Sequence, residues 1–200
     1  MPFRPPRFGA PPPVEATIAA LPEKATCLGL YFNDVIDAVA RSKPDFDIFA
    51  ATGLTKKRYF PFFSYSYADV MRLISAAAKV IHPRVSHGEA LRRMGHSVYD
   101  KLFGTRVGHA MFGALGHDVR RILLTGPRGY DLSMNFGKLT AEGIDSQCVV
   151  YHFRDLPGLI ETYQVGVIEG ALRNLGVAGT VTIALTDVGN ADVEIRWISA

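Results

Sequence analysis

The sequence YHFRDLPGLIETYQVGVIEGALRNLG, residues 151–176, is the part of the chain that most strongly indicates the fold. It begins as the end of a strand, is interrupted at Pro157 and Gly158, and continues as a helix because apolar residues then recur every three or four positions. The buried face of this helix is predicted to be Leu159, Ile160, Tyr163, Val167, Ala171 and Leu175. Gly166 and Gly170 share one face, although glycine inside a helix costs about 1 kcal/mol relative to alanine. We therefore expect an interface at these two glycines, where another element passes close to the backbone.

The chain before this stretch is predicted to be mainly helical. Apolar residues with helical spacing occur in CLGLYFNDVIDAVARS (27–42), FDIFAATGL (46–54) and YADVMRLISAAAKVIH (67–82). A further helix is expected from Ser86 to Gly104, and residues 106–124 supply one bent helix or two short ones.

The hydrophobic period changes from 3.6 to 2 after Gly129, which is typical of strands with one buried face. Strands are predicted at 130–136, 138–143, 147–153, 179–186 and 191–199, and the last two are joined by a turn containing Gly189 and Asn190. Helices followed by a mostly antiparallel sheet that carries one packed helix make an α+β fold.

The stretch RYFPFFSYSY, residues 58–67, is rich in aromatic residues. Pro61 disfavours a regular strand, so we expect a loop. Its rings either cover the core or line a ligand pocket.

The chain divides into a proline-rich N-terminal arm, residues 1–24, and a single α+β domain of the ligand-binding type, residues 25–200. Proline fixes φ and lacks a backbone donor, so the arm is expected to be extended or disordered, with a short helix at 14–21. Such an arm serves as a tether or docks on a partner in polyproline geometry.

Composition is that of a globular protein, with 48% hydrophobic and 20% charged residues. The net charge of +3 is small and its cations are scattered, which argues against nucleic acid as a partner. No apolar run is long enough to span a membrane, and prolines break the region where a signal peptide would lie. Cys27 and Cys148 lie among apolar residues, which predicts that both are buried free thiols and not partners in a disulfide. We expect a cytoplasmic protein.

Three stretches carry a resemblance to a known superfamily: LGLYFNDVIDAV (28–39), GEALRRMG (88–95) and residues 151–176. They resemble the haem nitric-oxide/oxygen-binding (H-NOX) domain and its relatives, the V4R domains and the Bet3-type subunits of the TRAPP transport complexes. Residues 27–199 are also similar to a myxobacterial family of paralogous, uncharacterised proteins of about this length. The resemblance implies a helical half followed by an antiparallel sheet.

The resemblance also implies a role for His117. The haem domains carry an iron-ligating histidine on a helix before a Tyr-x-Ser-x-Arg strand end, and His117 lies 35 residues before His152. In those domains the motif holds the haem propionates, but this chain has Phe153 and Asp155 at the corresponding positions. Arg154 is displaced by one residue, which turns a strand side chain to the opposite face. His117 is therefore either a packed or hydrogen-bonded helical residue or, with haem as a possible cofactor, its ligand.

Tyr151, His152 and Arg154 form the densest polar cluster, at a strand end beside a helix start. They form either a sheet edge with satisfied hydrogen bonds or, together with Tyr163, the rim of a pocket for a small molecule, in which Arg154 would clamp an anion. No arrangement of catalytic or metal-binding residues stands out, so we expect neither an enzyme nor a metal site apart from haem.

These features lead to one main hypothesis. The chain is predicted to be a non-catalytic sensory or regulatory module that binds a small, largely apolar ligand between the helical half and the sheet. It would signal through a homodimer or a partner protein. The alternatives are a dimerising assembly subunit like the Bet3-type proteins and a haem-dependent gas sensor.

Overall fold

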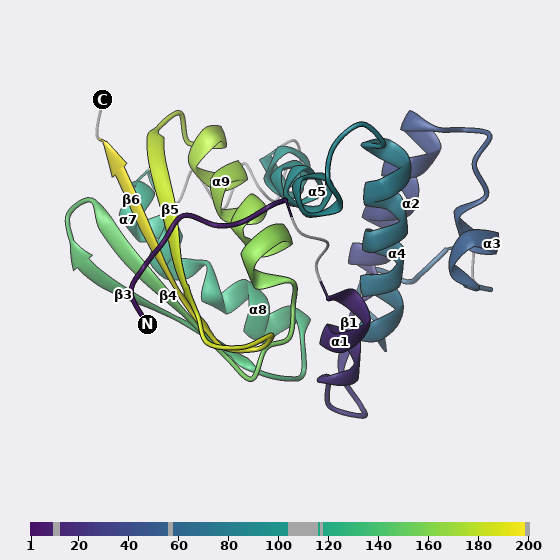
Figure 1. Ribbon diagram of the computed structural model, residues 1–200, viewed down its shortest axis with the longest axis horizontal. Coiled ribbons are helices and arrows are strands. Elements are labelled where there is room, and N and C mark those ends of the chain that lie inside the picture. Colours follow the sequence, from purple (N-terminus) through teal and green to yellow (C-terminus); the bar gives the residue numbers. More distant parts are fainter. Residues whose placement is uncertain (10–12, 56–57, 104–115, 117, 199–200) are drawn as a thin grey trace.

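The computed structural model describes residues 1–9, 13–55, 58–103, 116 and 118–198 of the chain. Helices occupy one side of the molecule and a four-stranded sheet the other, with α5 (His87–Phe103) and α9 (Val165–Asn174) side by side between them (Figure 1). This arrangement confirms the predicted α+β class.

The helical half is assembled around α4, whose apolar face was expected from its spacing. Its elements are α1 (Val14–Ala19), β1 (Thr26–Leu28), α2 (Leu30–Ser42), α3 (Ile48–Thr52), β2 (Ser64–Ser66) and α4 (Tyr67–Ile81). The predicted helices at 27–42, 46–54 and 67–82 are all present, and Gly53 ends α3 in the left-handed conformation with φ of 70°. β1 and β2 form a short antiparallel pair that joins the start of α2 to the start of α4.

The sheet is formed by the C-terminal half of the chain. Its strands are β3 (Lys138–Asp145), β4 (Cys148–Arg154), β5 (Ala178–Leu185) and β6 (Ala191–Ile198), in the spatial order β3-β4-β6-β5. All neighbours are antiparallel, as expected from the alternating pattern. One face of the sheet is buried under α7 (Val119–Thr125) and α9, where Leu123, Ile168 and Leu172 meet its apolar side chains.

The strand predicted at 130–136 is wrong. Residues Pro127–Ser133 form helix α8, and Met134 is extended and makes an isolated bridge with Cys27. Proline at the first helical position has the φ that a helix needs, and the Ser133 hydroxyl donates to the carbonyl oxygen of Gly129 one turn earlier, at 2.5 Å. Leu132, which the strand pattern placed in the core, is 80% exposed.

A π-helical turn, Ile160–Gln164, precedes α9 where a single continuous helix was expected. Leu159 before it has a positive φ of 56°. Turns of this kind insert an extra residue and occur often at functional sites.

Helix α9 packs directly against the backbone of α5. A side chain at Gly166 would overlap the carbonyl oxygen of Arg92, and a Cβ at Gly170 would lie 2.6 Å from the carbonyl oxygen of His96. Gly95 of α5 faces α9 in the same way, against the carbonyl oxygen of Tyr163. The element that approaches the two glycines of α9 is thus α5 of the same chain.

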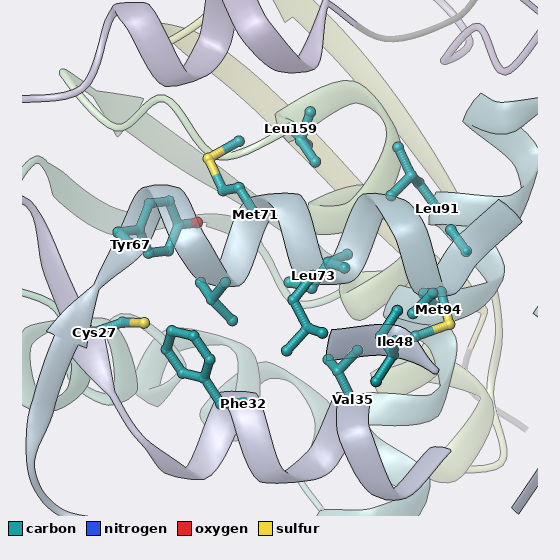
Figure 2. Packing of buried hydrophobic residues seen from close by; sticks show 14 of the residues in the cluster. Cys27, Phe32, Val35, Ile48, Tyr67, Met71, Leu73, Leu91, Met94 and Leu159 are labelled. Atoms are coloured by element: carbon teal, nitrogen blue, oxygen red, sulfur yellow. The ribbon is translucent and has the colours of Figure 1, made fainter. Parts of the chain in front are cut away.

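Buried apolar side chains form one cluster in the helical half and another between α9 and the sheet. Figure 2 shows the first cluster, in which Phe32 and Leu73 lie between α2 and α4, whereas Met71 points from the opposite side of α4 toward Leu159. Cys27 and Cys148 are both buried thiols, as predicted, and burial raises the pKa of Cys27 to about 12.

The first nine residues run along the domain surface as an extended strap that crosses from the sheet to α5 (Figure 1). Arg4 exchanges two backbone hydrogen bonds with Ile183 of β5 and forms an ion pair with Glu161 at 2.5 Å. At the far end of the strap, the carbonyl oxygen of Phe8 accepts a bond from the Ser86 hydroxyl. The arm was expected to be extended or disordered, and its first nine residues are extended and packed.

Candidate functional site

A cavity of about 170 Å³ lies between the helical half and the helices α8 and α9, which pack on the sheet. Its described wall takes residues from α2, α4, α5, α8, the π-helical turn and α9, and the strands of the sheet contribute none of them. The described lining residues are Tyr31, Tyr67, Val70, Ile74, Val98, Tyr99, Gly126, Gly129, Tyr130, Met134, Tyr163, Gln164 and Val167. Five of the eight tyrosines of the chain are in this list.

The tyrosines reach the cavity because each occupies an inward position on its own element. Tyr67 is the first residue of α4, which starts where the Ser66 hydroxyl accepts a bond from the backbone N–H of Asp69 at 3.3 Å. Tyr163 lies in the π-helical turn, next to Gln164. The turn therefore directs two polar side chains into the same space.

Hydrogen bonds fix several of the tyrosine rings. The Tyr31 hydroxyl donates to the Ser133 hydroxyl oxygen at 2.9 Å, linking α2 to α8 across the cavity. The Tyr130 hydroxyl donates to the side-chain carbonyl oxygen of Gln164, linking α8 to the π-helical turn. A phenol combines an apolar ring with one polar tip, so a wall of tyrosines is apolar over most of its area and polar at a few points.

Burial keeps these phenols in the neutral form. It raises the pKa of Tyr99 to about 12 and raises the pKa values of Tyr31, Tyr67, Tyr130 and Tyr163 above the usual value of tyrosine. At neutral pH the described cavity wall therefore carries no charge, because its other members are also uncharged. Such a wall favours an uncharged, largely apolar molecule, since a buried ion without a partner is strongly disfavoured.

The predicted polar cluster at the end of β4 is divided between two faces of the sheet. Tyr151 and Phe153 point into the core, whereas His152 and Arg154 lie on the outer face. His152 is 2.8 Å and Arg154 2.5 Å from the carboxylate of Asp192 on the neighbouring strand. Partial burial opposes the ionisation of Asp192, but these two bonds outweigh it and hold the pKa of the carboxyl below its usual value.

The structure thus places the predicted site residues in different surroundings. Tyr163 lines the main cavity, and Tyr151 lines a smaller one of about 30 Å³ beside it, where its hydroxyl donates to the carbonyl oxygen of Leu123 at 2.6 Å. His152 and Arg154 line neither of these cavities. His117 lies outside the described residues, so the structure does not locate its side chain.

Sequence reasoning missed most of the cavity wall. Tyr31 and Tyr67 lie in helices that the sequence predicted but were not recognised as ligand-facing groups, and Tyr130 was placed on a strand. A usable signal was present: the inward faces of several helices each carry a tyrosine, although leucine would fill the same position without a polar group to satisfy.

The sequence resemblance implies haem as a possible cofactor, but the described residues of the cavity do not fit it. A pocket for a drug-sized ligand holds about 300–1,000 Å³, more than the 170 Å³ present here. The described wall offers neither an imidazole for the iron nor a cation for the propionates. A deprotonated tyrosine can hold haem iron, but burial raises the pKa of Tyr99, which disfavours that form. Within the described part of the chain, no group of three or more His, Cys, Asp or Glu side chains could hold a metal ion.

Solved structures of H-NOX proteins have a similar fold. An H-NOX protein from S. oneidensis in the Fe(II) ligation state superimposes with a TM-score of 0.67 at 11% identity, covering 86% of this chain and 96% of that one. The Fe(II) unliganded H-NOX protein from K. algicida gives a TM-score of 0.64 at 10% identity, with 86% and 97% covered. An oxygen-binding H-NOX domain related to soluble guanylate cyclases gives 0.65 at 12% identity, with 86% and 95% covered.

At this level of identity the likeness to H-NOX proteins establishes the fold and leaves the ligand open. No curated protein sequence matches the chain significantly. A family profile does match, over residues 21–198, which is nearly the whole domain. The chain belongs to the family described as "Protein of unknown function (DUF2378)".

Proposed function

We propose that this domain is a non-catalytic sensory or regulatory module that binds a small, uncharged, largely apolar molecule between its helical half and its sheet. The observation that carries the proposal is the tyrosine-lined cavity at the junction of the two halves. An apolar cavity of about 150 Å³ is large enough for a benzene ring in another protein. A cavity of about 170 Å³ therefore suits a ligand with one ring and one polar group.

The polar group of the ligand is expected to meet the phenol hydroxyls or the side chain of Gln164. Neutral phenols donate hydrogen bonds well, so a carbonyl oxygen is a suitable partner for them. H-NOX proteins of the same fold contain Fe(II), and some bind nitric oxide or oxygen, according to the states in which they were solved. In this chain we propose that the tyrosine-lined cavity takes a small organic molecule.

Binding is tested on the purified full chain with two probes of nearly equal shape, benzamide and benzoate. Benzamide is uncharged and should raise the thermal unfolding temperature, whereas benzoate should not, because the cavity has no cation among its described residues. A protein stabilised equally by both probes, or by neither while native mass spectrometry finds nothing retained from a cell extract, would contradict the proposal.

A cavity-filling variant provides the structural control. Val70→Phe places a ring in the cavity from α4 and should abolish stabilisation by benzamide. Thr182→Phe adds the same ring at a half-exposed position of β5 that lines no part of the cavity, and should leave the stabilisation unchanged. Equal effects of the two variants would show that the probe binds elsewhere.

A sensory module also needs an output. We propose that ligand binding is signalled through a homodimer or a partner protein. Light scattering during gel filtration, with and without benzamide, tests for the homodimer.

The haem alternative predicts a Soret band after haem is added, and loss of that band in His117→Ala. Absence of the band would agree with the poor fit of the described residues to haem.

A further inference from the structure

The turn Phe60–Phe63 holds three large apolar side chains in water. Phe60, Phe62 and Phe63 are 69%, 81% and 63% exposed. No other three of the exposed large hydrophobic residues of the described chain lie within four consecutive positions; the remaining ones are Met1, Phe3, Phe46, Leu132, Ile144 and Ile198. A single exposed apolar residue needs no explanation, but a contiguous group marks an interaction surface.

The backbone of this turn is fixed against the start of α2. The backbone N–H of Gly29 donates to the carbonyl oxygen of Phe63 at 2.9 Å, and that of Leu30 donates to Pro61 at 3.1 Å. Phe63 closes the turn by donating to the carbonyl oxygen of Phe60 at 3.1 Å. Gly29 has no space for a side chain, because a Cβ there would overlap the carbonyl oxygen of Phe60.

The two tyrosines that flank the turn, Tyr59 and Tyr65, pack against the core and are hydrogen-bonded. Tyr59 stacks on Phe32 with ring centroids 4.1 Å apart, and the Asn33 side chain bonds both its backbone N–H and its carbonyl oxygen. The hydroxyl of Tyr65 accepts a bond from the N–H of Phe60 at 3.1 Å. The expectation that the aromatic residues of this stretch cover the core thus applies to Tyr59 and Tyr65, and the phenylalanines project away from it.

Positive charge lies next to the exposed rings. Lys56, Lys57 and Arg58 are the densest basic run of the sequence, and Arg58 is exposed. In the sequence this run ends two residues before Phe60. Exposed aromatic rings beside a basic run are the combination by which peripheral proteins bind anionic membrane surfaces.

We propose that the Phe60–Phe63 turn is a membrane-docking site that inserts its phenylalanine rings into the interface of an anionic bilayer. Phe60 and Phe63 lie together, with centroids 5.2 Å apart, so they can enter the acyl boundary as one unit. The neighbouring basic residues then reach the lipid phosphates. Because the turn is already fixed by hydrogen bonds, insertion requires little ordering of the chain. None of the described helices is long and apolar enough to cross a bilayer.

The test is sedimentation of the full chain with vesicles of phosphatidylcholine containing phosphatidylserine, compared with vesicles of phosphatidylcholine alone. The wild-type protein should bind the anionic vesicles, and added salt should release it. The triple variant Phe60→Ser, Phe62→Ser, Phe63→Ser should lower the partition coefficient by at least about tenfold, since each ring contributes buried apolar area. Ile198→Ser replaces an equally exposed apolar residue on β6 and should bind as the wild type does.

A spectroscopic readout covers the case in which the triple variant fails to fold. In Phe62→Trp the new indole should shift its emission to shorter wavelength and be quenched by brominated lipids, while the native Trp197 is buried and gives a constant background. Unquenched emission in the presence of vesicles would overturn the proposal. A wild-type protein that ignores vesicles but forms a dimer lost in the triple variant would also overturn it, and would assign the turn to protein contacts.

Discussion

Val70 and Val39 are both 1% exposed valines on helices of the same core, but only Val70 borders the cavity. A leucine at position 70 can place its extra carbon in the cavity. Burying that carbon adds at most about 0.8 kcal/mol to the free energy of unfolding. A leucine at position 39 meets closely packed neighbours, and overpacking costs about 1–3 kcal/mol. We expect Val70→Leu to keep or slightly raise the free energy of unfolding and Val39→Leu to lower it, as measured by denaturant titration.

Equal losses in the two leucine variants would mean that the cavity wall is as tightly packed as the core. The ligand proposal would then lose its structural basis. Benzamide added to Val70→Leu should stabilise less than in the wild type, because part of the space is taken.

At the residue scale, the sequence predicted which side chains face inward better than it predicted which of them line the cavity together. The helical spacing put Tyr31 and Tyr163 on inward faces, and both do point inward. The spacing could not show that they meet, because they lie on α2 and the π-helical turn, and sequence period carries no information about which faces oppose each other in space. Alternation along β4 separates Tyr151 from His152 and Arg154, so a cluster that is dense in sequence divides between two faces.

The pair of helices α5 and α9 depends on glycine. In Gly166→Ala the new Cβ would overlap the carbonyl oxygen of Arg92, so the helices must separate. We expect the free energy of unfolding to fall by about 1–3 kcal/mol or more. Gly129→Ala is the matched control, since this helical glycine has nothing within 4 Å of its Cβ position, and it should stabilise by up to about 1 kcal/mol. Thermal and denaturant unfolding measure both variants, and similar effects in both would contradict the close packing.

The N-terminal strap is expected to protect the edge of β5. Deleting residues 1–9 removes the backbone pairing of Arg4 with Ile183, the ion pair with Glu161 and the contact of the Arg92 guanidinium with the Phe8 ring at 4.8 Å. The exposed edge should then exchange its amide hydrogens faster and favour self-association. Hydrogen exchange at Ile183 and light scattering measure these effects. Unchanged protection there would show that the strap does not hold the edge.

Prediction at the element scale failed where local pattern and tertiary packing disagree. The alternation of Tyr130, Leu132, Met134 and Phe136 matches a strand, but Pro127 starts a helix that runs to Ser133. Apolar and polar residues do alternate here, but the alternation does not define a buried face. In α8, Leu132 faces solvent and Tyr130 faces the cavity. Periods over so few residues are compatible with both structures, whereas the longer pattern of α4 admits only a helix.

At the scale of the whole molecule, the two halves are joined through neutral phenols. Folding buries Tyr67 and partly buries Tyr31, Tyr99, Tyr130 and Tyr163, and this burial raises the pKa of each in the folded state. The unfolded chain ionises near the usual tyrosine value of 10.0. Above that pH the unfolded state loses protons that the folded state keeps, so stability falls as pH rises.

We therefore expect the free energy of unfolding to be level near neutral pH, to start falling near pH 9 as the buried thiols of Cys27 and Cys148 ionise in the unfolded chain, and to fall more steeply from about pH 10 upward, by on the order of 1.4 kcal/mol per pH unit for each tyrosine that titrates only in the unfolded chain. Guanidinium titrations across this range measure the slope, and ultraviolet absorbance follows phenolate formation. Tyr163→Phe keeps the ring and removes one such group, so its slope should be shallower by about that amount. If all the tyrosines ionise while circular dichroism still reports the native fold, the phenols are accessible to water and the two halves do not enclose a dry cavity.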